Sequence, residues 1–110
     1  MSYEVIPTRL FKKQAKRLLK KYPSLKEELQ ELTSSLAEIP EQGTAIGCNT
    51  YKIRLAVKSK GRGKSGGMRI ITYLVSKEGV IFLLTIYDKS DIDTIDDKTL
   101  RVLVRDYMML

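Results

Sequence analysis

Two apolar runs in the second half of the chain constrain its fold more than any other feature. Residues 68–75 read MRIITYLV and residues 80–87 read VIFLLTIY, so apolar side chains occupy most positions in both. Because neighbouring side chains of a strand point to opposite faces, runs of this kind are typical of strands buried on both faces. The SKEG segment at 76–79 between them is a tight-turn signal. The sequence therefore predicts a buried hairpin at the centre of a sheet.

Two further segments are predicted to be strands. Residues 3–6 form a short candidate that is closed by Pro7. Residues 51–57 alternate between apolar and basic side chains, which is typical of a strand with one face on the core and one toward solvent. Residues 40–50, which contain two glycines, are predicted to be an irregular connector. Three consecutive strands favour an antiparallel meander, and the first strand could join it either at an edge or centrally.

Helical periodicity appears twice between the first strand and this connector. The first helix is predicted to begin at Thr8, to carry a basic polar face and to be stopped by Pro23. The second begins with Ser24, which together with Glu27 matches a capping box, and its polar face is acidic. The short link between them predicts an antiparallel helical hairpin.

A third amphipathic segment ends the chain. Thr94 is its predicted cap, and Asp96 and Asp97 stand in its first turn, where acidic side chains interact favourably with the helix dipole. The predicted order is β-α-α-β-β-β-α in a single α+β domain over residues 1–110. In this fold an antiparallel sheet packs against the N-terminal helical hairpin, with the helices on one face.

The charge of the chain is concentrated in one window. Residues 51–70 read YKIRLAVKSKGRGKSGGMRI and contain seven Lys or Arg and no acidic residue. Outside this window thirteen basic residues balance thirteen acidic ones, so the window holds the whole net charge of +7. Such a field attracts polyanions and is typical of a nucleic-acid site. Three of these charges, on Lys52, Arg54 and Arg69, fall on predicted strands, where they can converge on one phosphate.

Composition removes several classes of function. The chain has no histidine, which excludes histidine-based triads, most zinc sites and catalysis by imidazole. Cys48 is the single cysteine, so no internal disulfide can form. Neither a signal core nor an apolar run of about 18 residues is present, and we expect a cytoplasmic protein with no membrane partner.

Two motifs suggest a cofactor or a metal but do not support one. The Gly-Lys-Ser sequence at 63–65 resembles the end of a Walker A loop, yet Lys58 stands where that loop requires its first glycine. The five aspartates between positions 88 and 97 do not have the spacing of a Ca²⁺ loop. No cofactor or metal is therefore expected.

Three segments resemble the RelE/HigB toxins of bacterial toxin–antitoxin systems, and they resemble most closely the HigB-like branch. They are FKKQAKRLLKKY in the first helix, YKIRLAVKSKGRGKSGGMRIITYLV across the basic window, and IFLLTIYDKSD at the end of the hairpin. The resemblance implies a ribosome-dependent mRNA endonuclease that uses no metal, in which the 2′-hydroxyl attacks the adjacent phosphate. It also implies three partners, namely mRNA, the ribosome with its rRNA, and a cognate antitoxin, expected to be of the helix-turn-helix type.

The resemblance assigns the candidate catalytic residues. Lys52 and Arg54 match the paired basic positions of the first long strand, Arg69 the arginine that opens the next strand, and Lys89 the basic residue after the last one. Some members place a histidine near the last strand, and others a tyrosine in the final helix at the position of Ile95. Tyr87 is the substitute proposed for both.

Each candidate has an expected role. Arg54 and Arg69 hold the scissile phosphate, because arginine stays charged and binds phosphate through two nitrogens. Lys52 or Lys58 acts as the base, Lys89 stabilises the leaving oxygen, and Tyr87 stacks on a base or relays a proton. The window also supplies four residues expected to contact rRNA phosphates, namely Lys58, Lys60, Arg62 and Lys64.

Two other functions stay open at this point. A ParE-like relative of the same fold inhibits DNA gyrase by binding and cleaves nothing, but such an inhibitor does not need basic residues aligned on strands. A simple RNA-binding module is the second alternative, and it is disfavoured because few aromatic residues lie near the basic window.

Overall fold

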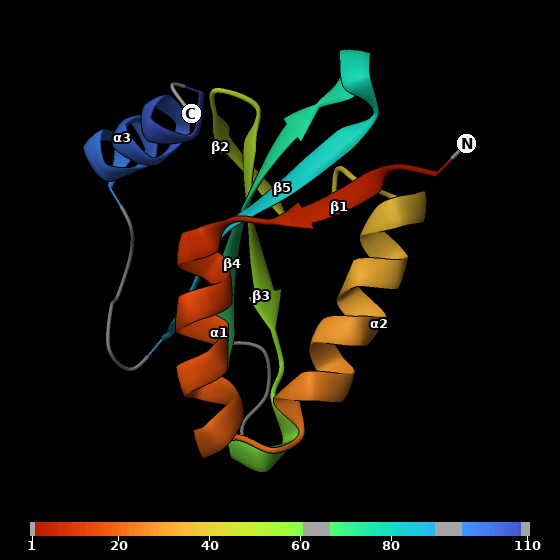
Figure 1. Cartoon of the computed structure of the whole chain (residues 1–110), viewed down its shortest axis with the longest axis vertical. Helices are drawn as coiled ribbons and strands as arrows, with labels where there is room; N and C mark the ends of the chain where they lie inside the picture. Colours follow the sequence, from red (N-terminus) through yellow and green to blue (C-terminus); the bar gives the residue numbers. More distant parts are fainter. Residues whose placement is uncertain (1, 61–66, 90–95, 109–110) are drawn as a thin grey trace.

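A five-stranded sheet forms the centre of the protein, in a computed structural model that describes residues 2–60, 67–89 and 96–108 (Figure 1). The strands are β1 (Glu4–Pro7), β2 (Thr44–Gly47), β3 (Thr50–Leu55), β4 (Met68–Val75) and β5 (Val80–Asp88). Their order across the sheet is β1-β5-β4-β3-β2. The predicted hairpin β4–β5 is therefore central, and the turn at 76–79 joins it through the left-handed Gly79.

One edge of the sheet is a placement that the sequence left open, and the strand at the other edge was not predicted. β1 is an edge strand, and it runs parallel to β5 because the chain crosses over through two helices before the meander begins. The connector expected at residues 40–50 contains β2, which pairs antiparallel with β3. The turn between them is Cys48–Asn49, and both residues have positive φ, as a two-residue type I′ hairpin requires. The missing Asn-Gly signal explains why this strand was not predicted.

Helices cover both faces of the sheet rather than one. On one face lie α1 (Arg9–Lys21) and α2 (Leu25–Glu38), which diverge from a short link (Figure 1). Their buried residues Phe11, Leu18 and Leu36 share one core cluster with inward residues of β3, β4 and β5. Helix α3 (Asp97–Met108) places Val104 against a second cluster, formed by Ile71, Phe82, Leu84 and Tyr87 on the other face. None of the helices in the described parts of the chain is long and apolar enough to cross a bilayer.

The start of α1 holds the second half of β5 in place. The Thr8 hydroxyl accepts a hydrogen bond from Phe11 N–H at 3.1 Å and donates one to Leu84 O at 3.0 Å. Leu84 is the extra residue of a β-bulge, because the β4–β5 register shifts from Ile71 opposite Thr85 to Thr72 opposite Leu83. One turn later Gln14 Oε1 accepts from Ile86 N–H at 3.0 Å. Backbone groups of β5 beyond the end of β1 are thus bonded to α1, which fixes the strand end that carries the candidate residues.

The start of α2 differs from the sequence prediction, and at the start of α3 the described capping bond comes from Asp96. Ser24 makes no capping bond at the start of α2, so the predicted capping box is wrong. Its hydroxyl instead contacts Glu28 Oε1 at 3.1 Å and Ser59 Oγ at 2.5 Å. At the start of α3, Asp96 Oδ1 accepts from Thr99 N–H at 2.7 Å, and this bond lowers the pKa of Asp96. The cap expected at Thr94 lies outside the described residues.

Candidate active site

Three of the predicted catalytic residues form one row across the sheet. Arg54 on β3 is directly opposite Arg69 on β4, and Arg69 is directly opposite Tyr87 on β5. Directly opposite residues have their side chains on the same face of a sheet. Lys52 lies two positions before Arg54 and therefore shares that face. Because Ile53, Ile70 and Ile86 point into the core beneath α1 and α2, the row lies on the opposite face.

Burial increases along the row from the edge of the sheet toward its centre. Arg54 is exposed and Lys52 is half-buried, whereas Arg69 is only 4% exposed and Tyr87 5%. One guanidinium nitrogen of Arg69, Nη1, donates to Met68 O at 3.2 Å. The strands therefore hold Arg69 and Tyr87 in fixed positions and leave Arg54 and Lys52 accessible to a ligand.

The electrostatics of the row favour an anion. Burial lowers the pKa of Arg69, and the nearby charge of Arg54 lowers it further. Like charges directly opposite one another destabilise a sheet. A phosphate placed between the two guanidinium groups would offset their repulsion, and arginine can bind it through two nitrogens.

Tyr87 adds a neutral donor to this positive site. Burial raises the pKa of its phenol, and the charge of Arg69 offsets only part of this effect. The phenol therefore keeps its proton at neutral pH. Its hydroxyl is buried and has no hydrogen-bond partner in the part of the chain that the structure describes. Such a group keeps an unused hydrogen-bond donor, and it cannot serve as a base at neutral pH.

The remaining basic candidates lie beyond the end of the row. Lys89 follows β5 directly and is half-buried, and its N–H donates to Gly67 O at 3.1 Å. Lys58 is exposed at the other side of the β3–β4 connection, and its N–H donates to Glu28 Oε2 at 2.8 Å. Arg62 and Lys64 lie outside the described residues.

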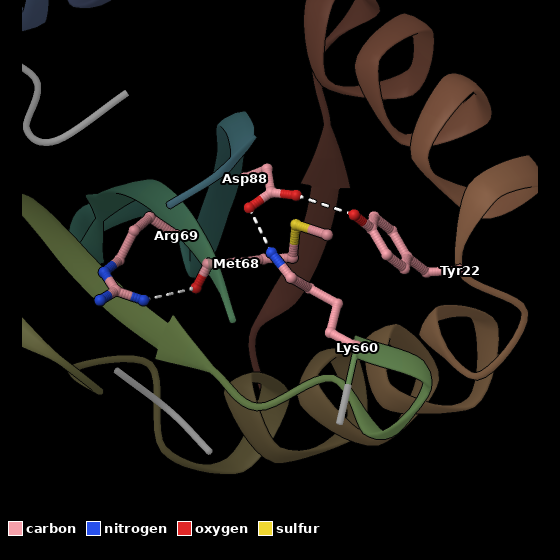
Figure 2. A network of polar contacts seen from close by, with 5 residues as sticks. All are labelled: Tyr22, Lys60, Met68, Arg69 and Asp88. Atoms are coloured by element: carbon pink, nitrogen blue, oxygen red, sulfur yellow. Dashed lines mark hydrogen bonds and ion pairs between the residues drawn. The ribbon is translucent and has the colours of Figure 1, made fainter. Parts of the chain in front are cut away.

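Lys60 belongs to a different set of contacts (Figure 2). Its ammonium forms an ion pair with Asp88 Oδ1 and lies 5.4 Å from the centre of the Tyr22 ring. The Tyr22 hydroxyl donates to Asp88 Oδ2 at 3.1 Å. The Lys60 side chain is 9% exposed and that of Asp88 2%, so most of the Lys60 side chain is covered by protein. Asp88, at the end of an otherwise apolar strand, was the one sequence signal for this cluster.

A model of the family described as the RelE toxin of the RelE/RelB toxin–antitoxin system matches residues 4–107. This chain belongs to the RelE toxin family. Among solved structures it is similar to a double arginine-to-alanine mutant of the E. coli toxin RelE in the free state, with a TM-score of 0.62 and 18% identity, covering 96% of this chain and 98% of that one. The isolated E. coli RelE toxin matches with a TM-score of 0.57 and 16% identity, covering 94% and 98%. The RelE-like fold is thereby confirmed, and the HigB-like branch stays a prediction.

Proposed function

We propose that this RelE-family toxin is a ribosome-dependent mRNA endonuclease that inhibits translation in the cytoplasm. The row Arg54–Arg69–Tyr87, with Lys52 on the same face, is the observation that supports the proposal. It combines one buried and one exposed positive charge with a neutral hydroxyl donor and an accessible amine. An inhibitor that only binds another protein has no need of such an arrangement.

The proposed reaction is an internal transesterification. The ribose 2′-oxygen forms a bond to the adjacent phosphorus, the bond from phosphorus to the 5′-oxygen breaks, and the products carry a 2′,3′-cyclic phosphate and a 5′-hydroxyl. Arg54 and Arg69 hold the phosphate and stabilise the charge that develops on its oxygens. The 2′-hydroxyl proton passes to Lys52 or Lys58 in its neutral form, and Lys52 shares the face of the row. The leaving 5′-oxygen takes up a proton from water and becomes the 5′-hydroxyl. Lys89 stabilises the charge that develops on this oxygen, and Tyr87 can donate a hydrogen bond to it. The mechanism assigns no step to a metal or cofactor.

Binding to the ribosome is assigned to the β3–β4 connection. Lys58 is exposed there, and Arg62 and Lys64 are proposed to contact rRNA phosphates as well. The family implies an antitoxin that neutralises the protein, and a helix-turn-helix protein is proposed for that role. Contacts with phosphates make affinity fall as salt rises, so ribosome binding by this toxin should be steeply salt-dependent.

The test is cleavage of mRNA on translating ribosomes, followed by mapping of the new RNA ends. We expect Arg54→Ala and Lys52→Ala to lower the single-turnover rate about 10²-fold, which is typical of removing one group that stabilises developing charge. Lys77→Ala is the matched control, because Lys77 is exposed in the turn at the far ends of β4 and β5. Full activity of the Arg54 variant would refute the site. Intact mRNA together with inhibited DNA supercoiling would favour the gyrase inhibitor.

A further inference from the structure

Asp88 is a buried carboxylate for which the proposed reaction has no role. It is 2% exposed at the end of β5, and both of its oxygens are engaged, Oδ1 by Lys60 and Oδ2 by Tyr22. A buried charge is costly unless it is paired and hydrogen-bonded. In this cluster the carboxylate forms an ion pair with the Lys60 ammonium and accepts a hydrogen bond from the Tyr22 phenol. The ammonium also lies over the Tyr22 ring.

The cluster joins three segments that are distant in sequence (Figure 2). Tyr22 directly follows α1, Lys60 ends the 3₁₀ turn Lys58–Lys60 after β3, and Asp88 ends β5. Asp88 is directly opposite Met68, one position along from the pair Arg69 and Tyr87. Because adjacent side chains of a strand point to opposite faces, the contacts of Asp88 beneath the sheet fix the backbone that presents Tyr87 above it.

Neighbouring contacts hold the same end of the molecule. Ser59 N–H donates to Ser24 Oγ at 2.9 Å, next to the bond between Lys58 N–H and Glu28. On the other side of the connection, Gly67 packs so closely that a Cβ there would lie 2.0 Å from Leu55 O. Both described ends of the β3–β4 connection are therefore anchored. Among the residues of this connection that the structure describes, Lys60 alone has a charged side chain that is mostly covered by protein.

We infer that Lys60, Asp88 and Tyr22 form a latch that positions the end of β5 and the β3–β4 connection, and that Lys60 acts through Asp88 and not by contacting RNA. Lys60 is thus a positioning residue. Its charge is neutralised inside the protein, so it adds little to the attraction of a polyanion, unlike the exposed Lys58 two residues earlier. The effect on cleavage rests on the function proposed above, whereas the coupling between Lys60 and Asp88 does not.

The salt dependence of ribosome binding separates a latch from an RNA contact. The probe is purified ribosomes, titrated with wild type, Lys60→Met and Lys58→Met over a series of KCl concentrations. Each lost phosphate contact reduces the slope of log affinity against log salt by about 0.7–0.9. We expect an unchanged slope for Lys60→Met and a reduced slope for Lys58→Met. A reduced slope for Lys60→Met, with cleavage unaffected by Asp88→Asn, would overturn the inference.

A double-mutant cycle provides the second readout. Lys60→Met and Asp88→Asn should each lower the single-turnover cleavage rate roughly tenfold to a hundredfold, as expected when reacting groups lose their alignment. The double variant should lose no more than either single variant, because both changes open the same latch. Independent, multiplicative losses would contradict it.

The same cycle measured by urea unfolding separates this inference from the proposed function. If the wild type cuts no RNA, the function is wrong, while non-additive changes in the urea midpoint still support the latch. Should Asp88→Asn fail to fold, Tyr22→Phe removes only the hydrogen bond to Oδ2. We expect this variant to lower the midpoint more in wild type than in the Lys60→Met background, and equal shifts would refute the coupling.

Discussion

Replacing Arg54 by methionine is expected to stabilise the protein and to lower the rate of the proposed cleavage about 10²-fold. Arg54 is exposed and directly opposite the buried Arg69, whose pKa is lowered by burial and by the charge of Arg54. Methionine keeps an unbranched apolar chain of similar length over the sheet and removes only the charge and its hydrogen-bond donors. The site would thus exchange stability for function, as active sites commonly do.

The magnitude follows from the cross-strand geometry. Like charges directly opposite each other in a sheet cost about 0.2–1 kcal/mol. In a domain of this size that range corresponds to a rise in Tm of about 1–6 °C. Exposure of Arg54 screens its charge, so the lower half of the range is the better expectation.

Thermal unfolding at low and at high ionic strength provides the assay. The gain of Arg54→Met should shrink at high salt, because screening weakens the repulsion that the substitution removes. At constant ionic strength, phosphate should raise the Tm of the wild type more than that of the variant, since a ligand stabilises only the state that binds it.

Lys77→Met is the matched control, because it removes the same charge at the far ends of β4 and β5. An equal gain from this control would attribute the effect to net charge alone. A loss of stability in Arg54→Met at low salt would refute the repulsion itself.

Two further predictions concern Tyr87 and two glycines. Tyr87→Phe removes a buried hydroxyl with no described partner, so urea unfolding should show little change at neutral pH. Burial raises the pKa of Tyr87 in the folded protein above its unfolded value of about 10. The contribution of this raised pKa to stability is complete below the unfolded pKa and is lost as pH rises through the folded pKa. Phenylalanine does not titrate, so the variant should lose less stability than the wild type in alkali. Gly67→Ala should unfold the protein or lower its urea midpoint sharply, since the new Cβ meets Leu55 O at 2.0 Å. Gly79→Ala, at φ +67° with no atom within 4 Å, should cost only about 1 kcal/mol, and equal effects of the two alanines would contradict this packing.

Local patterns predicted the elements that depend on local physics. The apolar runs identified β4 and β5 as central, and periodicity located α1, α2 and α3. β2 escaped prediction because it is four residues long and depends on pairing with β3 through the turn at Cys48–Asn49. The position of α3 on the second face of the sheet could not be predicted, because the apolar stripe of a helix does not indicate which surface it covers.

The candidate site divides in the same way. That Arg54, Arg69 and Tyr87 stand on strands was predicted from the sequence, and that they share one row depends on the register of three strands. A shift of one residue would have turned Arg69 into the core.

The sequence by itself determined that this chain is basic in one window, builds its sheet around one apolar hairpin and resembles the RelE toxins, because charge and periodicity are properties of neighbouring residues. Only the tertiary structure decided which positive charges are exposed and which are paired inside the protein. Lys60 and Lys58 stand two positions apart, yet one is paired with Asp88 in the interior and the other is exposed. The physical reason is that a buried charge takes its partner from wherever the fold brings one within reach, here across 28 positions of sequence.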